Sequence, residues 1–227
     1  MSRAVERLGG IVIPLRSVPT APLRFISAFT DIGQGAGLAT TSGARPFLAV
    51  IATGVLANQD VGVDFTGTDW AWMESWIFIG VLAALFIAFW IMDREGKSER
   101  IRPGGRAMEA SAQYRFFCGL AGALLFAGSL ADGGETSWPG LLVGAVIGFI
   151  GYLALGRLFM RANQRVLAAG DPGVVLGIGR DLLTIALTVL VVLADVVGYV
   201  VLAAALVLIF AARRREGEKY EGLRVLR

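Results

Sequence analysis

Six stretches of this chain are long and apolar enough to be membrane-crossing segments. They span residues 32–57, 71–92, 116–131, 138–160, 173–194 and 196–212. A helix needs about 20 apolar residues, rising about 1.5 Å each, to cross a hydrocarbon core of about 30 Å. With 56% hydrophobic and 17% charged residues, the composition is also too apolar for an ordinary soluble domain. The sequence therefore predicts an all-α, polytopic transmembrane helix bundle.

The loops between these segments alternate in charge. The loop after residue 57 and the turn after residue 131 contain acids but no Lys or Arg, whereas the loops after residues 92 and 160 are rich in arginine. Positive residues stay in cytoplasmic loops, so the basic loops are expected inside. A single crossing over residues 173–212 would put the basic tail outside, so we expect a turn near Asp195. The prediction is six crossings in a bacterial inner membrane, with both termini cytoplasmic.

The two ends of the chain are basic. Residues 1–31 have no long apolar run and no cleavage site that would indicate a signal peptide. We expect this segment to lie on the inner membrane surface, with a disordered tail as the alternative. Residues 213–227 are predicted to be a basic cytoplasmic tail. The positive charge at this side indicates contact with anionic membrane lipids and not with nucleic acid.

When the six segments are paired, three helical hairpins of similar charge pattern result. Each begins with an arginine on its inner side and turns at an acid. The pairs are Arg45 with Asp60, Arg115 with Asp132, and Arg180 with Asp195. The positive-inside rule alone can produce this pattern. The alternative is a tandem array of related hairpins around a shared axis.

Gly140, Gly144 and Gly148 recur every fourth residue on the fourth segment. One face of this helix therefore lacks side chains, so a neighbouring backbone can come close. The face is expected to pack helices within one chain, and a homo-oligomer contact is the alternative.

Arg45 lies deep in the first segment, 12 residues before Ala57, or about 18 Å from the outer boundary at helical rise. Pro46 removes a backbone donor and Gly43 loosens the helix, so this segment is expected to be broken or re-entrant at Arg45. Thr41 and Ser42 precede Arg45 by four and three residues and share its helix face.

The fifth segment offers an acidic counterpart to Arg45. Asp181, Thr184 and Thr188 follow helical spacing, and Asp181 lies about 21 Å below Asp195, close to the depth of Arg45. Charges at this depth usually pair or line a cavity. We therefore predict an ion pair between Arg45 and Asp181, with Arg180 as a nearer alternative partner. The set is either a structural clasp or a solute-binding site.

The stretch Gly43-Ala44-Arg45-Pro46-Phe47-Leu48, preceded by small residues, resembles the opening of a bacterial multi-pass membrane family known as domain of unknown function 4126. The similarity continues through the apolar segments, including the stretch DPGVVLGIGRD, to about Arg215. The resemblance implies a membrane bundle and no particular activity.

Several kinds of chemistry are disfavoured by the residues present. The chain has no histidine and a single cysteine, Cys118, and it has no Gly-Lys-Ser/Thr phosphate loop. We expect no enzyme activity, no metal and no cofactor. A small transporter or channel with an arginine site for an anionic or polar solute is the first prediction. A membrane scaffold that uses glycine faces to hold partners is the second, and a lipid-active enzyme is the third.

Overall fold

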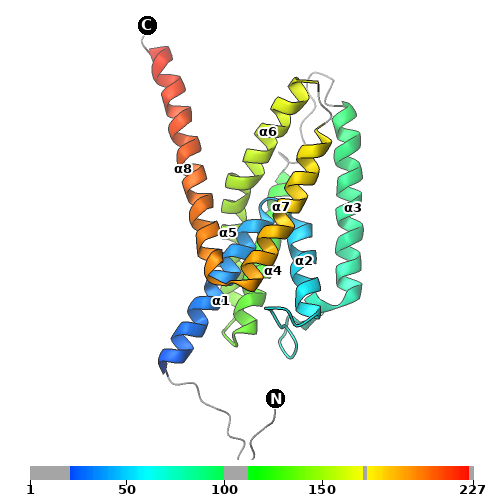
Figure 1. Cartoon of the computed structure of the whole chain (residues 1–227), viewed down its shortest axis with the longest axis vertical. Coiled ribbons are helices and arrows are strands. Elements are labelled where there is room, and N and C mark those ends of the chain that lie inside the picture. Colours follow the sequence, from blue (N-terminus) through cyan, green and yellow to red (C-terminus); the bar gives the residue numbers. More distant parts are fainter. Residues whose placement is uncertain (1–20, 100–111, 171–172, 225–227) are drawn as a thin grey trace, which may run out of the picture.

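The computed structural model describes residues 21–99, 112–170 and 173–224, and these residues form helices and turns with no strand. Figure 1 shows the bundle. The elements are α1 (Ala21–Ser42), α2 (Pro46–Asn58), η1 (Ala71–Glu74), α3 (Trp76–Glu99), α4 (Ala112–Asp132), α5 (Trp138–Gly151), η3 (Tyr152–Gly156), α6 (Arg157–Ala168), α7 (Val174–Leu193) and α8 (Val196–Arg224).

Four helical units are long and apolar enough to cross a membrane, as expected of an integral membrane protein. They are Ala112–Asp132, Trp138–Val166, Val174–Leu193 and Val196–Arg214. Many of the side chains on their outer faces are apolar and exposed, among them Leu142 at 68% and Phe210 at 70%. An apolar outer surface of this kind suits contact with lipid tails. The predicted all-α membrane bundle is confirmed at this level.

The first apolar segment forms a hairpin of two half-helices and not one crossing. The hydroxyl of Ser129, near the end of α4, donates to the carbonyl of Asp31 at 2.8 Å. Gln34 donates to the carbonyl of Gly62, in the loop that follows α2, at 3.0 Å. The beginning of α1 and the end of α2 therefore lie at the same end of the bundle, the end with the acidic turns, and the break between them lies inside (Figure 1).

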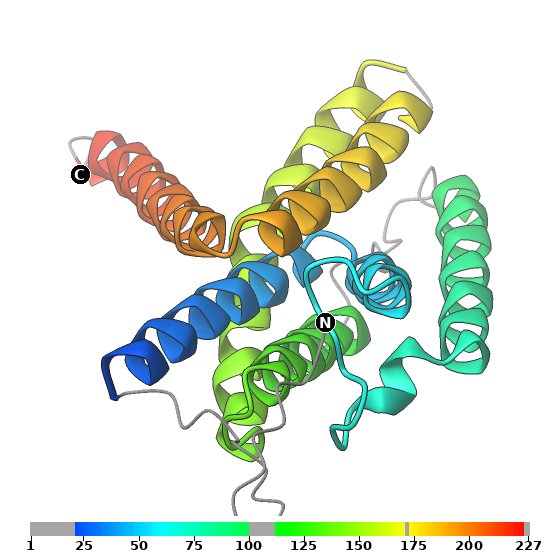
Figure 2. The ribbon, with the colours of Figure 1, turned by 60° about the horizontal axis from the view of Figure 1, so that its bottom comes forward.

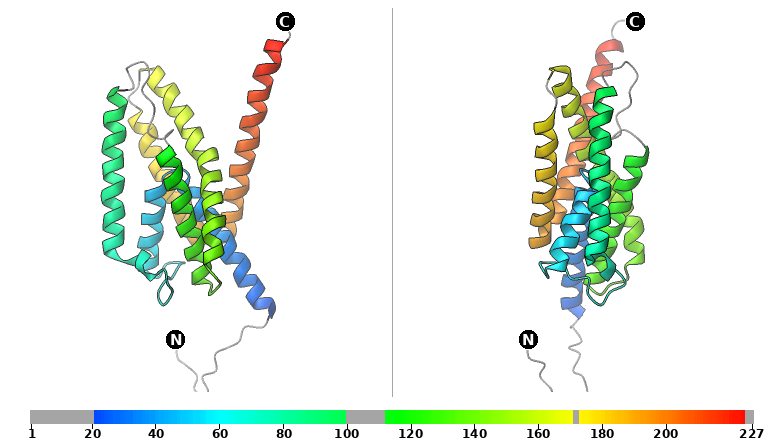
Figure 3. Two further views of the ribbon diagram at one scale, coloured as in Figure 1. Left: turned by 180° about the vertical axis from the view of Figure 1, so that it is seen from behind. Right: turned by 90° about the vertical axis from the view of Figure 1, so that its right-hand side faces the viewer.

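The expected break at Arg45 and Pro46 is thus present, and the chain reverses direction there. Length and hydropathy suit a crossing over residues 32–57, but neither reports the direction of the chain after a break. α1 begins at Ala21, within the predicted interfacial segment of residues 1–31, with Pro22 in its first turn, where no backbone donor is needed. Residues 1–20 lie outside the described residues. The start of α1 and the end of α8 project from opposite ends of the bundle (Figure 3).

The predicted tail is also different, because α8 continues as one helix to Arg224 instead of ending near residue 212. The turn before α8 lies near Asp195, as the charges of the loops indicated. α7 ends at Leu193 and α8 begins at Val196, and Gly198 N donates to the carbonyl of Asp195 at 3.0 Å. A turn of this kind lets α7 and α8 run back in opposite directions from the acidic end.

α1 is the central helix of the bundle. Every residue from Gly33 to Ala44 is buried, and α1 contacts α2, α4, α5, α7 and α8. Figure 2 shows it running inward between α8 and α4, whereas α3 stands at the margin beside α2. A helix surrounded on all sides needs small residues wherever another backbone comes close.

The glycines of α1 supply those close contacts, each toward a different neighbour. A Cβ at Gly37 would lie 2.4 Å from the Cα of Gly198 in α8, and one at Gly43 would lie 2.0 Å from the backbone of Gly151 in α5. Both distances are far below van der Waals contact. Gly37 is therefore a packing position within α1, and Gly43, which was expected to loosen the segment, is a packing position at the break itself.

The glycine face of α5 packs inside the chain. A Cβ at Gly144 would lie 2.4 Å from the carbonyl oxygen of Gly122, and one at Gly148 would lie 2.4 Å from that of Cys118, both in α4. Gly140 likewise faces Leu130 and Ala127 of the same helix. The face is thus occupied by α4.

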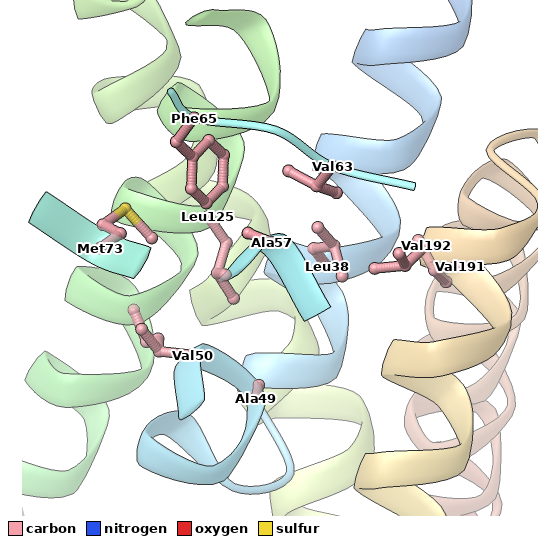
Figure 4. Packing of buried hydrophobic residues seen from close by; sticks show 11 residues of the cluster. Leu38, Ala49, Val50, Ala57, Val63, Phe65, Met73, Leu125, Val191 and Val192 are labelled. Atoms are coloured by element: carbon pink, nitrogen blue, oxygen red, sulfur yellow. The ribbon is translucent and has the colours of Figure 1, made fainter. Parts of the chain in front are cut away.

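An apolar core joins the hairpin to its neighbours (Figure 4). Leu38 of α1 and Val50 of α2 cluster with Leu125 of α4 and with Val191 and Val192 of α7. Phe65 and Met73, from the segment between α2 and α3, are fully buried in the same cluster. The loop at the acidic end therefore closes the hairpin against α4.

The hairpin can be tested by cysteine labelling in a variant without Cys118. Ser27 in α1 and Thr136 in the α4–α5 turn are exposed at the acidic end, and Ala169 is exposed after α6 at the other end. In membrane vesicles, Ser27→Cys and Thr136→Cys should react with an impermeant maleimide from one side and Ala169→Cys from the other. Labelling of positions 27 and 169 from the same side would contradict the hairpin and restore the crossing.

The close contact between α1 and α8 predicts a steric effect at Gly198. A Cβ there would lie 1.8 Å from the carbonyl oxygen of Gly33, which no rotamer relieves. Gly198→Ala should destabilise the protein by about 1–3 kcal/mol or more. Gly177→Ala in α7 is the matched control, since nothing lies within 4 Å of its Cβ, and it should be neutral or stabilising by up to about 1 kcal/mol. Thermal unfolding in detergent measures both, and equal melting temperatures would refute the contact.

Candidate functional site

The candidate site is the tip of the hairpin, where α1 stops and α2 starts. The last turn of α1 is closed by bonds from Gly43 N to the Thr40 carbonyl at 3.1 Å and from Ala44 N to the Thr41 carbonyl at 3.0 Å. Arg45 is extended, with φ −144° and ψ 96°, and caps α2, whose first residue is Pro46. Proline suits this position because its fixed φ fits the helix and no donor is required.

Arg45 contacts Asp181 of α7, as predicted from the similar depth of the two residues. Its Nε lies 2.6 Å from Asp181 Oδ1, and the two side chains are 12% and 21% exposed. The pair joins the tip of the hairpin to α7. Since the tip lies about 18 Å from the acidic end at helical rise, this pair lies within the apolar depth of the bundle.

Arg180, the residue before Asp181, binds the other side of the tip. It is buried with 3% exposure, and its Nε donates to the Ala44 carbonyl at 2.8 Å. Its Nη2 also donates to this carbonyl and to the hydroxyl of Tyr114. Tyr114 in turn donates to the Ala44 carbonyl at 2.7 Å. Arg180 is therefore not the partner of Asp181 in the described structure.

Two aromatic rings add to the environment of Arg180. Its guanidinium carbon lies 5.8 Å from the ring centroid of Tyr114 and 5.7 Å from that of Phe159. These separations allow cation–π attraction, which strengthens when the cation is removed from water. The second arginine thus remains charged at depth with a carbonyl, a hydroxyl and two ring faces around it.

The two charges of α7 match the two half-helix ends. The carboxyl end of α1 carries partial negative charge, and the cation Arg180 binds there. The amino end of α2 carries partial positive charge, and Asp181 binds the Arg45 that caps it. Two arginines and one carboxylate therefore meet at the tip.

The hydroxyl groups predicted to flank Arg45 bind the helix backbone. Thr41 donates to the Leu38 carbonyl at 2.8 Å, Ser42 contacts the carbonyl of Cys118 in α4 at 3.1 Å, and Thr184 donates to the Arg180 carbonyl at 2.9 Å. Their single donors are therefore used inside the protein. Thr188 is fully buried, and its hydroxyl has no hydrogen-bond partner among the described residues.

A small aromatic cavity lies beside Arg45. Its volume is about 20 Å³, enough for about one water molecule. Phe47 and Phe89 pack at its side, with ring centroids 5.0 Å apart. The lining residues are Arg45, Pro46, Phe47, Phe86, Phe89, Trp90 and Tyr114. The cavity therefore separates the charged tip from α3.

A second polar network lies at the acidic end of α1. Gln34 donates to Asp195 Oδ1 at 3.0 Å, and its own carbonyl oxygen accepts from Ser129 at 3.1 Å. Burial raises the pKa of Asp195 above its usual range, and the hydrogen bond from Gln34 opposes the rise. In the described part of the chain, no group of three His, Cys, Asp or Glu side chains could hold a metal ion.

Comparisons with protein-family models, with curated proteins and with solved structures give no match for this chain. The resemblance of residues 43–48 to the family of unknown function stays a prediction.

Three features of the site were missed from the sequence. Tyr114 lies two residues before the predicted start of the third segment, so it was taken as part of a loop. Gln34 lies between two glycines and was read only as part of a small-residue stretch. A polar amide in such a stretch is itself a signal of a buried contact. Arg180 was a candidate only as an alternative partner of Asp181, so its bonds to the Ala44 carbonyl and Tyr114 were not predicted; helical geometry turns adjacent residues about 100° apart.

The Arg45–Asp181 contact predicts non-additive effects on stability. Arg45→Ala and Asp181→Ala should each lower the melting temperature, since removing one member of a buried pair costs about 3–5 kcal/mol and partial exposure reduces this cost. The double variant should recover much of the loss. The control combines Arg45→Ala with Glu135→Ala. Glu135 is exposed at the acidic end, so the effects of these two substitutions on stability should be additive. Additive losses for Arg45 and Asp181 would show that the pair contributes nothing.

Proposed function

We propose that the protein is a small membrane transporter that binds an anionic or polar solute at the hairpin tip. The observation that carries the proposal is the Arg45–Asp181 pair at a break between two half-helices inside the bundle. Non-helical backbone at membrane depth is tolerated only where it is buried in protein or lines a cavity. Transporters place their binding sites at such breaks, where half-helix ends supply partial charges.

The proposed topology has five crossings and one re-entrant hairpin. The crossings are α3, α4, the unit α5–η3–α6, α7 and α8, and the arginine-rich end faces the cytoplasm. Trp72, Trp76 and Trp138, exposed at 44%, 60% and 65%, lie near the acidic end. Tryptophan is enriched at membrane boundaries, which supports placing the outer interface there.

The guanidinium of Arg45 supports an anion as the solute. Arg45 has one contact within the described residues, through Nε to Asp181, and its two Nη atoms have no hydrogen-bond partner there. A guanidinium presents these groups as a planar fork that matches carboxylate and phosphate oxygens. A solute anion beside Arg45 would take these free donors while Asp181 keeps the side chain in place.

The aromatic cavity supports a route to the site beside α3. α3 stands at the margin of the bundle, and its contacts are mainly with α2 and η1 (Figure 2). Phe89 of α3 closes the cavity by packing on Phe47 and Phe117, with ring centroids 5.0 and 5.4 Å away. A small displacement of α3 from α2 would enlarge the cavity and admit solute to Arg45.

A scaffold function is less well supported, because it would need a free glycine face. Gly144 and Gly148 are covered by α4 of the same chain, so this face has no room for a partner helix. A scaffold also has no need of a deep ion pair beside a helix break. The transporter proposal uses both features.

Anion flux into liposomes tests the proposal. The native protein should carry at least one of chloride, nitrate, phosphate or acetate. Arg45→Lys keeps the charge but loses the planar fork, so it should retain the native melting temperature and lose at least about tenfold in flux, equivalent to about 1.4 kcal/mol. Arg165→Lys, exposed on α6, is the control and should transport normally. If the native protein carries none of these anions, the transporter proposal fails.

A further inference from the structure

A second cavity lies between α6 and α8, far from the hairpin tip. Its volume is about 90 Å³, and three of its nine lining residues are arginines: Arg157 and Arg161 from α6, and Arg213 from α8. The other six are apolar, and Leu153 and Leu208 are among them. None of the lining residues is acidic. The cavity therefore combines a cationic rim with an apolar wall.

The geometry of the two helices explains why the arginines converge. Arg157 and Arg161 are four residues apart and share one face of α6. α8 leans away from α6 toward its C-terminal end, so the two helices form a V that opens at the end opposite the acidic turns (Figure 1). Arg213 faces the α6 arginines across this V, because all three side chains line the same cavity.

The depth of the cavity coincides with the boundary of the hydrocarbon core. Arg213 follows Val196, the first residue of α8, by 17 residues, or about 25 Å at helical rise. Arg157 follows Trp138, the first residue of α5, by 19 residues, or about 28 Å. A core of about 30 Å places both guanidinium groups at the level of the lipid phosphates on the basic side.

From these observations we propose that the V between α6 and α8 is a binding site for one anionic phospholipid. The phosphate binds Arg157, Arg161 and Arg213, and an acyl chain lies along Leu153 and Leu208. The apolar wall favours a lipid over a free phosphate ion, which would leave this wall in contact with water. The site is separate from the hairpin tip and does not depend on transport.

Native mass spectrometry of the detergent-purified full chain tests this site. Titration with phosphatidylglycerol should give one tightly bound lipid, and phosphatidylcholine should bind much more weakly. Each arginine near the membrane surface contributes about a fivefold gain in affinity, so Arg157→Gln with Arg213→Gln should weaken phosphatidylglycerol binding about 30-fold. The matched control removes Arg165 and Arg214, one from each helix and neither lining the cavity, and should bind normally.

A third variant separates the cavity from general surface charge. Ala212→Trp fills the cavity without changing the charge and should also block binding. The proposal is overturned if both double variants lose lipid equally, if Ala212→Trp binds with native affinity, or if inorganic phosphate displaces the lipid at equal concentration. The last result would assign the site to a free anion. Melting temperatures of all variants identify any that fail to fold.

Discussion

Ending one helix and starting another inside a membrane leaves backbone carbonyl and N–H groups without water to bind them, and this constraint governs the arrangement around the hairpin. At the tip, the carbonyl of Ala44 receives bonds from Tyr114 and Arg180. The start of α2 requires fewer acceptors, because Pro46 has no N–H donor to satisfy. Asp181, the residue after Arg180 in α7, holds the Arg45 side chain. Two adjacent residues of α7 therefore contact the break: Arg180 binds the Ala44 carbonyl and Asp181 binds the side chain of Arg45, which caps α2.

The break can sit this deep only because α1 is surrounded by its own chain. Its glycines let α5 and α8 approach to backbone contact, at Gly43 and Gly37 respectively. Lipid offers no hydrophobic gain for helix association, so such close contacts and the hydrogen bonds beside them hold the helices together. The same residues that reduce helix propensity in isolation thereby increase the buried contact area of the hairpin.

The sequence predicted the helical class, the turn near Asp195 and the contact between Arg45 and Asp181, because hydropathy and helical rise report length and depth. It also predicted the break at Gly43 to Pro46, but it left the direction of α2 open, since such a break is compatible with both a kinked crossing and a re-entrant hairpin. The basic residues at the N-terminus favoured the crossing. The direction of the chain after the break is decided by tertiary contacts. Gln34 and Asp31 form hydrogen bonds with groups at the acidic end, and no local sequence pattern reveals these contacts.

The arginines of this chain show how one residue type serves two environments at different depths. Arg180 is almost completely buried and has its donors on a carbonyl and a phenol, with aromatic rings beside it. These contacts hold Arg180 against the tip. Arg157 and Arg213 line an open cavity at the level of the lipid headgroups, where the surrounding groups are apolar. Because a guanidinium at that boundary gains from a phosphate partner, the proposed lipid site would let the shallow arginines connect the protein to the bilayer while Arg180 organises the tip.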